Sequence, residues 1–368
     1  MQIPYLDLTI QYQALEPQMN ERIQRVLKGA QYILGPEVEE CEQKLAEFVG
    51  APYCLTAASG TDAWLMALLA HDVKPGDEII VPSFSFFATA EVIALIGAVP
   101  IFADIDPRTF NLDVSQVESL ITSKTRGIAP VSLYGQVADM KEINELAQKY
   151  NIPVMEDAAQ SFGARYQGQT SCNLSAFGCT SFFPAKPLGC YGDGGAVFCQ
   201  TEEHYEILKQ IRVHGQSGRY HHTRMGFNCR MDTLQCAVIL GKLERYPWEI
   251  EQRQRIANTY SEEFQGIETL VTPLIKEDRD SVFAQYTLRV KKRDQFQKAL
   301  AEIGVPTSIH YPKGMHEQPA LAQYRPKEPL PVTESVCDEV ISLPLYADMP
   351  DAHVAYVVEC VKKVASHL

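Results

Sequence analysis

The chain has 368 residues, of which 46% are hydrophobic and 21% are charged, a balance typical of globular proteins, and its length predicts two domains. A formal net charge of -13 argues against nucleic acid as a partner, and no apolar run is long enough to predict a membrane span. The first residues lack a secretory pattern and the ten cysteines lack regular spacing, so we expect a cytoplasmic protein with buried thiols and no metal site.

Apolar spacing predicts the elements in chain order. Residues 37–49 keep the helical period, and beyond them short apolar runs alternate with helical patterns. This alternation predicts an α/β sheet of mostly parallel strands with helices on both faces. The predicted strands are Glu78–Val81, Val99–Ala103, Gly127–Val131, Pro153–Met155, Cys179–Phe183 and Gly194–Cys199. The predicted helices are Glu37–Val49, Thr61–Ala70, Thr89–Ile96, Val114–Leu120 and Met140–Tyr150.

The pattern becomes less regular after about residue 250, where charged residues and prolines are frequent. We therefore predict a large domain over residues 1–250 and a smaller C-terminal α+β domain over residues 251–368. In open α/β sheets ligands bind at the carboxyl ends of the strands, and the motifs below fall at such ends.

The first motif is Ser59-Gly60-Thr61-Asp62, which follows a short apolar segment and opens a predicted helix. Free backbone N–H groups at a helix start, with hydroxyls beside them, predict a phosphate site. A plain helix N-cap is the alternative.

The second motif is an acid, Asp157, at the end of a predicted buried strand. Burial of an acid is costly unless something pairs with it, and Asp157 is suited to a protonated ring nitrogen. The alternative is a structural Asp that the fold itself satisfies.

The third motif places Lys186 between an apolar strand and a glycine run that ends at Gly195. Desolvation in such a pocket lowers the pKa of an amine, which suits Schiff-base chemistry, although most lysines are simply solvated. The dinucleotide fingerprint of a Rossmann dehydrogenase is absent. A phosphate turn, a strand-end acid and a pocket lysine together indicate pyridoxal 5'-phosphate as the cofactor.

A basic segment runs from Arg212 to Arg230 and holds Arg219, Arg224 and three histidines but no acid. Guanidinium groups match phosphate and carboxylate geometry, so the segment is either an anion-binding surface or a solvated loop.

The motifs resemble those of the DegT/StrS family of sugar aminotransferases from about Tyr32 to Lys242, and again at His310-Tyr311-Pro312. The resemblance rests on Ser-Gly-Thr-Asp-Ala, Glu-Asp-Ala-Ala-Gln, Ser-Phe-Phe-Pro-Ala-Lys and Tyr-Gly-Asp-Gly-Gly-Ala. It implies the aspartate-aminotransferase type of fold (PLP fold type I), working as a homodimer with shared active sites. One departure is Trp64, where relatives usually carry Leu.

The resemblance also implies the roles of individual residues. Lys186 forms the Schiff base, Asp157 pairs with the ring nitrogen and Gln160 lies by the ring hydroxyl. The remaining residues bind the phosphate (Gly60, Thr61, Ser181, and Asn228 from the partner), stack on the ring (Phe86) or face the substrate (Arg230 from the partner, His310 and Tyr311).

The sequence of these motifs is most similar to that of enzymes that aminate UDP-2-acetamido-2-deoxy-3-oxo-glucuronate for bacterial surface polysaccharides such as the O-antigen of lipopolysaccharide. The resemblance implies a UDP-sugar substrate and L-glutamate as amino donor. Three alternatives remain: another nucleotide-linked 3- or 4-keto sugar, a same-fold dehydratase, which would carry His in place of Lys186, and a non-catalytic sugar-binding or regulatory relative.

Overall fold

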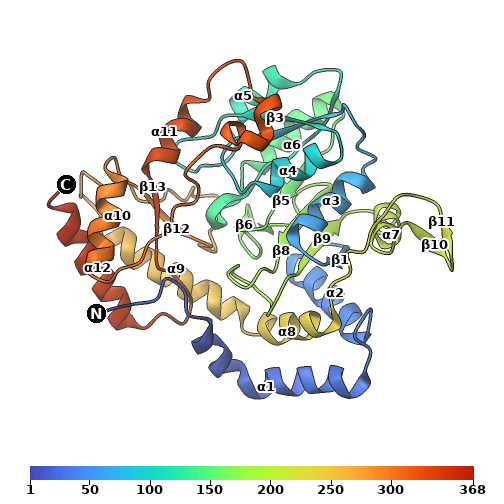
Figure 1. The fold of residues 1–368 in the computed structure, drawn as a ribbon, viewed down its shortest axis with the longest axis horizontal. Coiled ribbons are helices and arrows are strands. Elements are labelled where there is room, and N and C mark those ends of the chain that lie inside the picture. Colours follow the sequence, from blue (N-terminus) through green and yellow to red (C-terminus); the bar gives the residue numbers. More distant parts are fainter.

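The computed structural model describes residues 1–368 and is built around one mixed sheet (Figure 1). Its strands are β1 (Tyr53–Ala57), β2 (Glu78–Pro82), β3 (Val99–Ala103), β4 (Thr125–Ile128), β5 (Met155–Asp157), β8 (Phe177–Ser181) and β9 (Gly195–Cys199). Strand pairing gives the orders β3-β2-β4 and β5-β8-β9-β1. Parallel bridges from Ile128 to Val154 and from Val131 to Asp157 join the two parts into one layer.

Most neighbouring strands in this layer are parallel, as predicted. Strand β9 is the exception, because it is antiparallel to both β1 and β8. Since β8 and β9 run in opposite directions, the segment between them, which contains Lys186, leaves and returns at the same edge of the sheet.

Helices cover both faces of the sheet, because successive strand residues point to opposite sides. Leu55 joins the core under one set of helices, whereas its neighbour Cys54 joins the core under the other. The first set is α3 (Gly60–Ala70), α4 (Ala88–Leu95) and α7 (Glu202–Ile211). The opposite set is α1 (Leu8–Gly29), α2 (Pro36–Val49), α5 (Val114–Leu120), α6 (Met140–Tyr150) and α8 (Thr233–Leu243).

A second hydrophobic core lies in the C-terminal part of the chain, around the antiparallel pair β12 (Tyr286–Arg289) and β13 (Val340–Leu343). Helix α9 (Tyr246–Glu263) connects the two cores, since Tyr246 packs in the first and Ile256 in the second. Figure 1 shows α9 running from α8 toward α10 (Arg293–Glu302) and α12 (Asp351–Ala365). The division at residue 250 falls within this helix and stays a prediction.

Two segments pack against parts of the fold that are distant from them in the sequence. Ile3, near the N-terminus, is buried in the second core. Helix α11 (Pro331–Glu339), after the short turns η2 (Met315–Glu317) and η3 (Pro319–Tyr324), packs back toward the first part of the chain, where Asp104 accepts hydrogen bonds from the N–H groups of Val332 and Thr333 at 2.9 and 2.8 Å.

A short hairpin, β10 (Gln216–Gly218) and β11 (His221–His222), projects from the body at the right of Figure 1. The remaining short elements are β6 (Arg165–Tyr166), β7 (Gln169–Thr170) and the turn η1 (Leu133–Gly135). None of the helices combines the length and apolar character that crossing a bilayer requires.

Most predicted elements lie within a few residues of the observed ones. Predicted strand Pro153–Met155 is observed at Met155–Asp157, and Cys179–Phe183 is observed at Phe177–Ser181. Helix α1 and strand β1 were not predicted. All ten cysteines are buried and unpaired, as expected.

Candidate active site

A cavity of about 470 Å³ opens at the carboxyl ends of β2, β5 and β8 and at the start of α3. Its wall also includes the segment after β8 and a stretch of the C-terminal part of the chain. The structure therefore gathers most of the predicted site residues around one space. Those that line the cavity are Gly60, Thr61, Phe86, Asp157, Gln160, Ser181, Lys186, His310 and Tyr311.

The start of α3 forms one end of the cavity. Ser59 caps the helix, because its hydroxyl accepts a hydrogen bond from the N–H of Asp62 at 3.0 Å. Gly60 lies so close to Ser181 that a β-carbon added to it would sit 2.6 Å from the Ser181 β-carbon. The cap thus coexists with a tight cradle of N–H and hydroxyl groups that fits a phosphate.

Asp157 lies at the end of β5, in the cavity wall. Its Oδ2 atom accepts a hydrogen bond from the Thr89 hydroxyl at 2.7 Å, and its Oδ1 atom accepts one from the N–H of Ala159 at 3.1 Å. Burial raises the pKa of the Asp157 carboxyl, while the two hydrogen bonds and the charge of Lys186 oppose that shift. Both oxygens are therefore fixed, with lone pairs left to face the cavity.

The Lys186 side chain is partly buried, and it lines the cavity. Desolvation lowers the pKa of its amine, and the nearby charge of Asp157 acts in the opposite direction. Burial and the charge of Lys186 also lower the pKa of His310. A larger neutral fraction of the Lys186 amine favours attack on a carbonyl carbon.

Gln160 is buried between two tyrosines. Its Oε1 atom accepts a hydrogen bond from the N–H of Tyr134 at 2.9 Å, and its Nε2 atom donates to the Tyr311 hydroxyl at 3.1 Å. Phe86 is 55% exposed, and its ring centroid lies 6.2 Å from that of Tyr311. Aromatic and amide groups thus form a partly polar wall, in which the rings of Phe86 and Tyr311 are tilted by 45° to each other.

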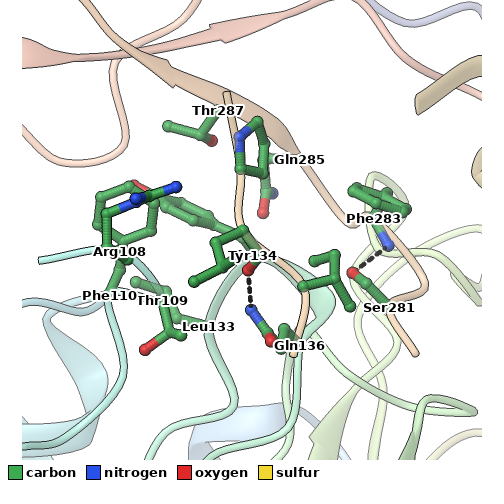
Figure 2. A pocket seen from close by; sticks show the side chains of 13 residues that line it. Arg108, Thr109, Phe110, Leu133, Tyr134, Gln136, Ser281, Phe283, Gln285 and Thr287 are labelled. Carbon is green, nitrogen blue, oxygen red and sulfur yellow. Dashed lines mark hydrogen bonds between the residues drawn. The ribbon is translucent and has the colours of Figure 1, made fainter. Parts of the chain in front are cut away.

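A second, much smaller cavity of about 20 Å³ adjoins this wall (Figure 2). In Figure 2, residues 133–136 face residues 281–287 across it. Gln285 lines both cavities, and its Oε1 atom is buried without a hydrogen-bond partner. The small cavity has room for about one water molecule.

The cavity residues that were not predicted from the sequence as site residues include the polar residues Ser85, Thr89 and Gln285. Ser85 lies in the loop after β2 and Thr89 in the first turn of α4, so the polar residues that follow this strand were the available signal. Trp64, noted only as a departure, is buried in the same wall and donates from Nε1 to the Thr89 carbonyl oxygen at 3.0 Å.

The basic segment does not act as one surface. Arg212 is buried and forms an ion pair and hydrogen bond with Glu42, so the prediction of an anion-binding group is wrong for this residue. The sequence pattern misled because the acid that pairs with Arg212 lies far from it along the chain. The hairpin residues Arg219, His221 and His222 are exposed.

Asn228 and Arg230 do not line the cavity of their own chain. They flank Cys229, whose carbonyl oxygen accepts a hydrogen bond from the N–H of Ala58 at 2.8 Å, just before the phosphate cradle. Asn228 is exposed, and the Arg230 Nε atom is buried without a hydrogen-bond partner.

Comparison with known proteins identifies the family to which the chain belongs. Residues 13–362 match the DegT/DnrJ/EryC1/StrS aminotransferase family. The chain belongs to this family. This DegT/DnrJ/EryC1/StrS member is therefore an aminotransferase, and the predictions of the family, of the fold type and of an enzyme are confirmed.

Individual relatives of this aminotransferase differ in their described roles. It is 50% identical to the UDP-2-acetamido-2-deoxy-3-oxo-D-glucuronate aminotransferase of Pseudomonas aeruginosa, over 96% of this chain and 97% of that protein. It is 41% identical to a pleiotropic regulatory protein of Geobacillus stearothermophilus, over 100% of both chains. Its fold matches that of NtdA from Bacillus subtilis, crystallised with bound cofactor PMP, with a TM-score of 0.93 and 30% identity over 99% of this chain and 85% of that one.

Proposed function

We propose that this aminotransferase moves an amino group from L-glutamate to carbon 3 of UDP-2-acetamido-2-deoxy-3-oxo-glucuronate, with pyridoxal 5'-phosphate as cofactor. The observation that carries the proposal is the meeting of Lys186, Asp157 and the Gly60–Ser181 cradle around one cavity, in a chain half identical to an aminotransferase named for this substrate. The products are a 3-amino sugar and 2-oxoglutarate, and the amino sugar serves bacterial surface polysaccharide synthesis.

The residues present fit the cofactor. The cradle of Gly60, Thr61 and Ser181 suits its phosphate, and the aromatic and amide groups beside Phe86 suit its ring. When bound, pyridoxal phosphate supplies a carbonyl that takes up the amino group and a ring that accepts electrons.

The reacting side chains have separate tasks. Lys186 Nζ binds the cofactor at rest and, once displaced, moves the proton from the α-carbon of the donor. Asp157 Oδ atoms hold a proton on the ring nitrogen, which a buried carboxylate does well because water does not screen it. Gln160, His310 and Tyr311 form the wall that orients the ring and the sugar.

The substrate is tested with a panel of nucleotide sugars. Purified protein, L-glutamate and each UDP-linked keto sugar are incubated, and the amino sugar and 2-oxoglutarate are measured by mass spectrometry. We expect the 3-keto uronate to exceed its neutral 3-keto analogue and any 4-keto sugar in kcat/KM. Faster turnover of a 4-keto sugar would overturn the proposed substrate and leave the aminotransferase chemistry intact.

Recognition of the uronate carboxylate falls to Arg230, acting from a partner subunit. The support is that Arg230 lies outside the cavity of its own chain and has a buried Nε atom free to bond. Arg230→Gln is expected to weaken binding of the uronate more than binding of the neutral sugar, because a guanidinium binds a carboxylate through two parallel hydrogen bonds. Arg224→Gln, at an exposed site beside Gln210, is the matched control. Equal losses on both sugars would mean that Arg230 does not bind the carboxylate.

A regulatory role in addition to catalysis is the second candidate, favoured by the 41% identity to a regulatory protein. Colour tests the catalytic role of this chain, because a lysine-bound cofactor is yellow. A purified protein that stays colourless in excess pyridoxal phosphate and makes no amino sugar would overturn the proposed activity.

A further inference from the structure

The Asp157 carboxylate is held by a chain of hydrogen bonds that begins on another helix. Thr89, in the first turn of α4, donates its hydroxyl to Asp157 Oδ2 at 2.7 Å. The Thr89 hydroxyl also lies 3.5 Å from the Ser85 hydroxyl. Because the Thr89 proton is committed to Asp157, Ser85 is the donor in that second contact.

The backbone of Thr89 is fixed in turn. The Trp64 indole N–H donates to the Thr89 carbonyl oxygen at 3.0 Å, and both side chains are almost completely buried. Trp64 stands in the second turn of α3, whose first turn forms the phosphate cradle. One side chain therefore connects the cradle at one end of the cavity with the acid at the other.

We propose that Thr89 is a positioning residue for Asp157, and that the Trp64 indole holds Thr89 in place. The hydroxyl acts on the carboxylate and not on the substrate. It stabilises the ionised form and orients Oδ2, so that the carboxylate meets a ring nitrogen without having to reorient. This inference rests on the role proposed above for Asp157.

Several other groups surround Asp157, and they determine how a pH experiment is read. The titratable side chains whose charges act on it or on its neighbours are Lys186, Glu156, Cys179, Tyr311 and His310. Glu156 points away, since its carboxylate accepts from Ser132 and Ser171 at 2.7 Å each. None of these groups is altered by a substitution at Thr89, so comparing Thr89 variants isolates the hydroxyl.

The test compares Thr89→Val, which removes the donor at nearly constant volume, with Thr89→Ser, which keeps it. Without the hydroxyl the ionised carboxylate loses a stabilising hydrogen bond, so the pKa of Asp157 rises. As the pH is lowered, the carboxylate is then protonated, and activity is lost, at a higher pH than in the unaltered chain. We expect the acid limb of the kcat/KM profile to move up by about one pH unit in Thr89→Val, since hydrogen bonds to charged groups contribute on the order of one pKa unit or more. Thr89→Ser is expected to recover most of the shift.

A readout independent of turnover is the affinity for pyridoxal phosphate, measured by isothermal titration calorimetry. We expect about tenfold weaker binding in Thr89→Val and a smaller loss, in the same direction, in Trp64→Phe. Trp64→Phe keeps an aromatic ring but has no N–H to donate, and it carries the test if Thr89→Val does not fold.

Two results would overturn the inference. One is an acid limb and a cofactor affinity in Thr89→Val equal to those of the unaltered chain. The other is a lower thermal midpoint with an unmoved acid limb, which would make Thr89 merely structural. Failure of the role of Asp157 is seen separately, as normal turnover in Asp157→Asn.

Discussion

A β-carbon placed on Gly60 would lie 2.6 Å from the β-carbon of Ser181 and 3.1 Å from its hydroxyl oxygen. The first residue of α3 and the last residue of β8 thus touch without any room for a larger side chain. The cradle depends on this contact, because it brings the N–H groups of the helix start and the Ser181 hydroxyl to one point.

Gly60→Ala should therefore weaken cofactor binding. Forcing a methyl group into a packed site costs about 1–3 kcal/mol, which corresponds to an affinity lower by roughly 5- to 150-fold. Fluorescence titration with pyridoxal phosphate measures it. Gly29→Ala is the control, since a β-carbon there meets nothing within 4 Å. Unchanged affinity in Gly60→Ala would remove the cradle from the proposed site.

Lys186→Ala is expected to abolish turnover and the yellow absorbance of the bound cofactor, because no other amine lines the cavity. Binding of the cofactor itself should persist through the phosphate cradle. Absorbance spectra and a 2-oxoglutarate assay measure the two effects. Lys209→Ala, at a partly exposed lysine that lies outside the cavity and is paired with Glu206, should behave like the unaltered chain. Normal turnover in Lys186→Ala would refute the assignment.

Asp157→Asn should fold, since the amide oxygen still accepts from the N–H of Ala159 and the amide nitrogen can donate to the Thr89 hydroxyl. A neutral amide does not hold the ring nitrogen protonated, so kcat should fall by roughly 10²-fold, as when other electrostatic groups are deleted. Steady-state kinetics, with the thermal midpoint as a folding check, decide the matter. A kcat close to that of the unaltered chain would contradict the proposed role.

Arg212→Leu should destabilise the fold and leave substrate affinity unchanged. The Glu42 side chain is only 11% exposed, and breaking a buried ion pair costs about 3–5 kcal/mol. Chemical denaturation measures the loss. Adding Glu42→Gln should restore much of it, because the neutral amide still accepts the hydrogen bonds that Thr56 donates to Glu42. A stable Arg212→Leu protein with a raised KM would instead favour anion binding by Arg212.

Shared active sites predict complementation between two inactive variants. If Arg230 acts in the partner's site, a hybrid of Lys186→Ala and Arg230→Ala subunits has one site with both defects and one with neither. Refolding an equal mixture makes about half of the dimers hybrid, so roughly a quarter of all sites should be active. Native mass spectrometry must show that hybrids formed. Hybrids without activity would mean that each site uses residues of one chain only.

How much of this site was predictable depends on how far apart its partners lie along the chain. Asp157 ends a strand, and a local pattern of apolar residues places such a position at one edge of a sheet. Ser181 also ends a strand, but the pattern placed it inside the predicted strand Cys179–Phe183, and only the family resemblance assigned it to the phosphate. The bond from Thr89 to Asp157 spans 68 positions, and no local pattern marks it. Arg212 and Glu42 lie 170 positions apart, so an acid-free segment gave a false picture of free positive charge.

The same reasoning applies to the fold. The alternation of strands and helices predicted the layered sheet, but the reversed direction of β9 follows from its pairing with β1 and β8 and has no signature within residues 195–199. Helix α1 was missed because only Leu15, Met19 and Val26 are buried in its 22 residues, too sparse a stripe to predict an amphipathic helix.

The position of Ile3 has a consequence for the order of folding. Its N–H donates to the Gly304 carbonyl oxygen at 3.3 Å, and the N-terminal amine donates to the Tyr356 hydroxyl at 3.1 Å. Residues 1–3 therefore find these neighbours only after Gly304 and Tyr356 have been synthesised. The strands of the main sheet all precede residue 200 and can assemble earlier. The wall formed by His310 and Tyr311 is synthesised after the strands of the main sheet, so the cavity is complete only once these two residues have been added.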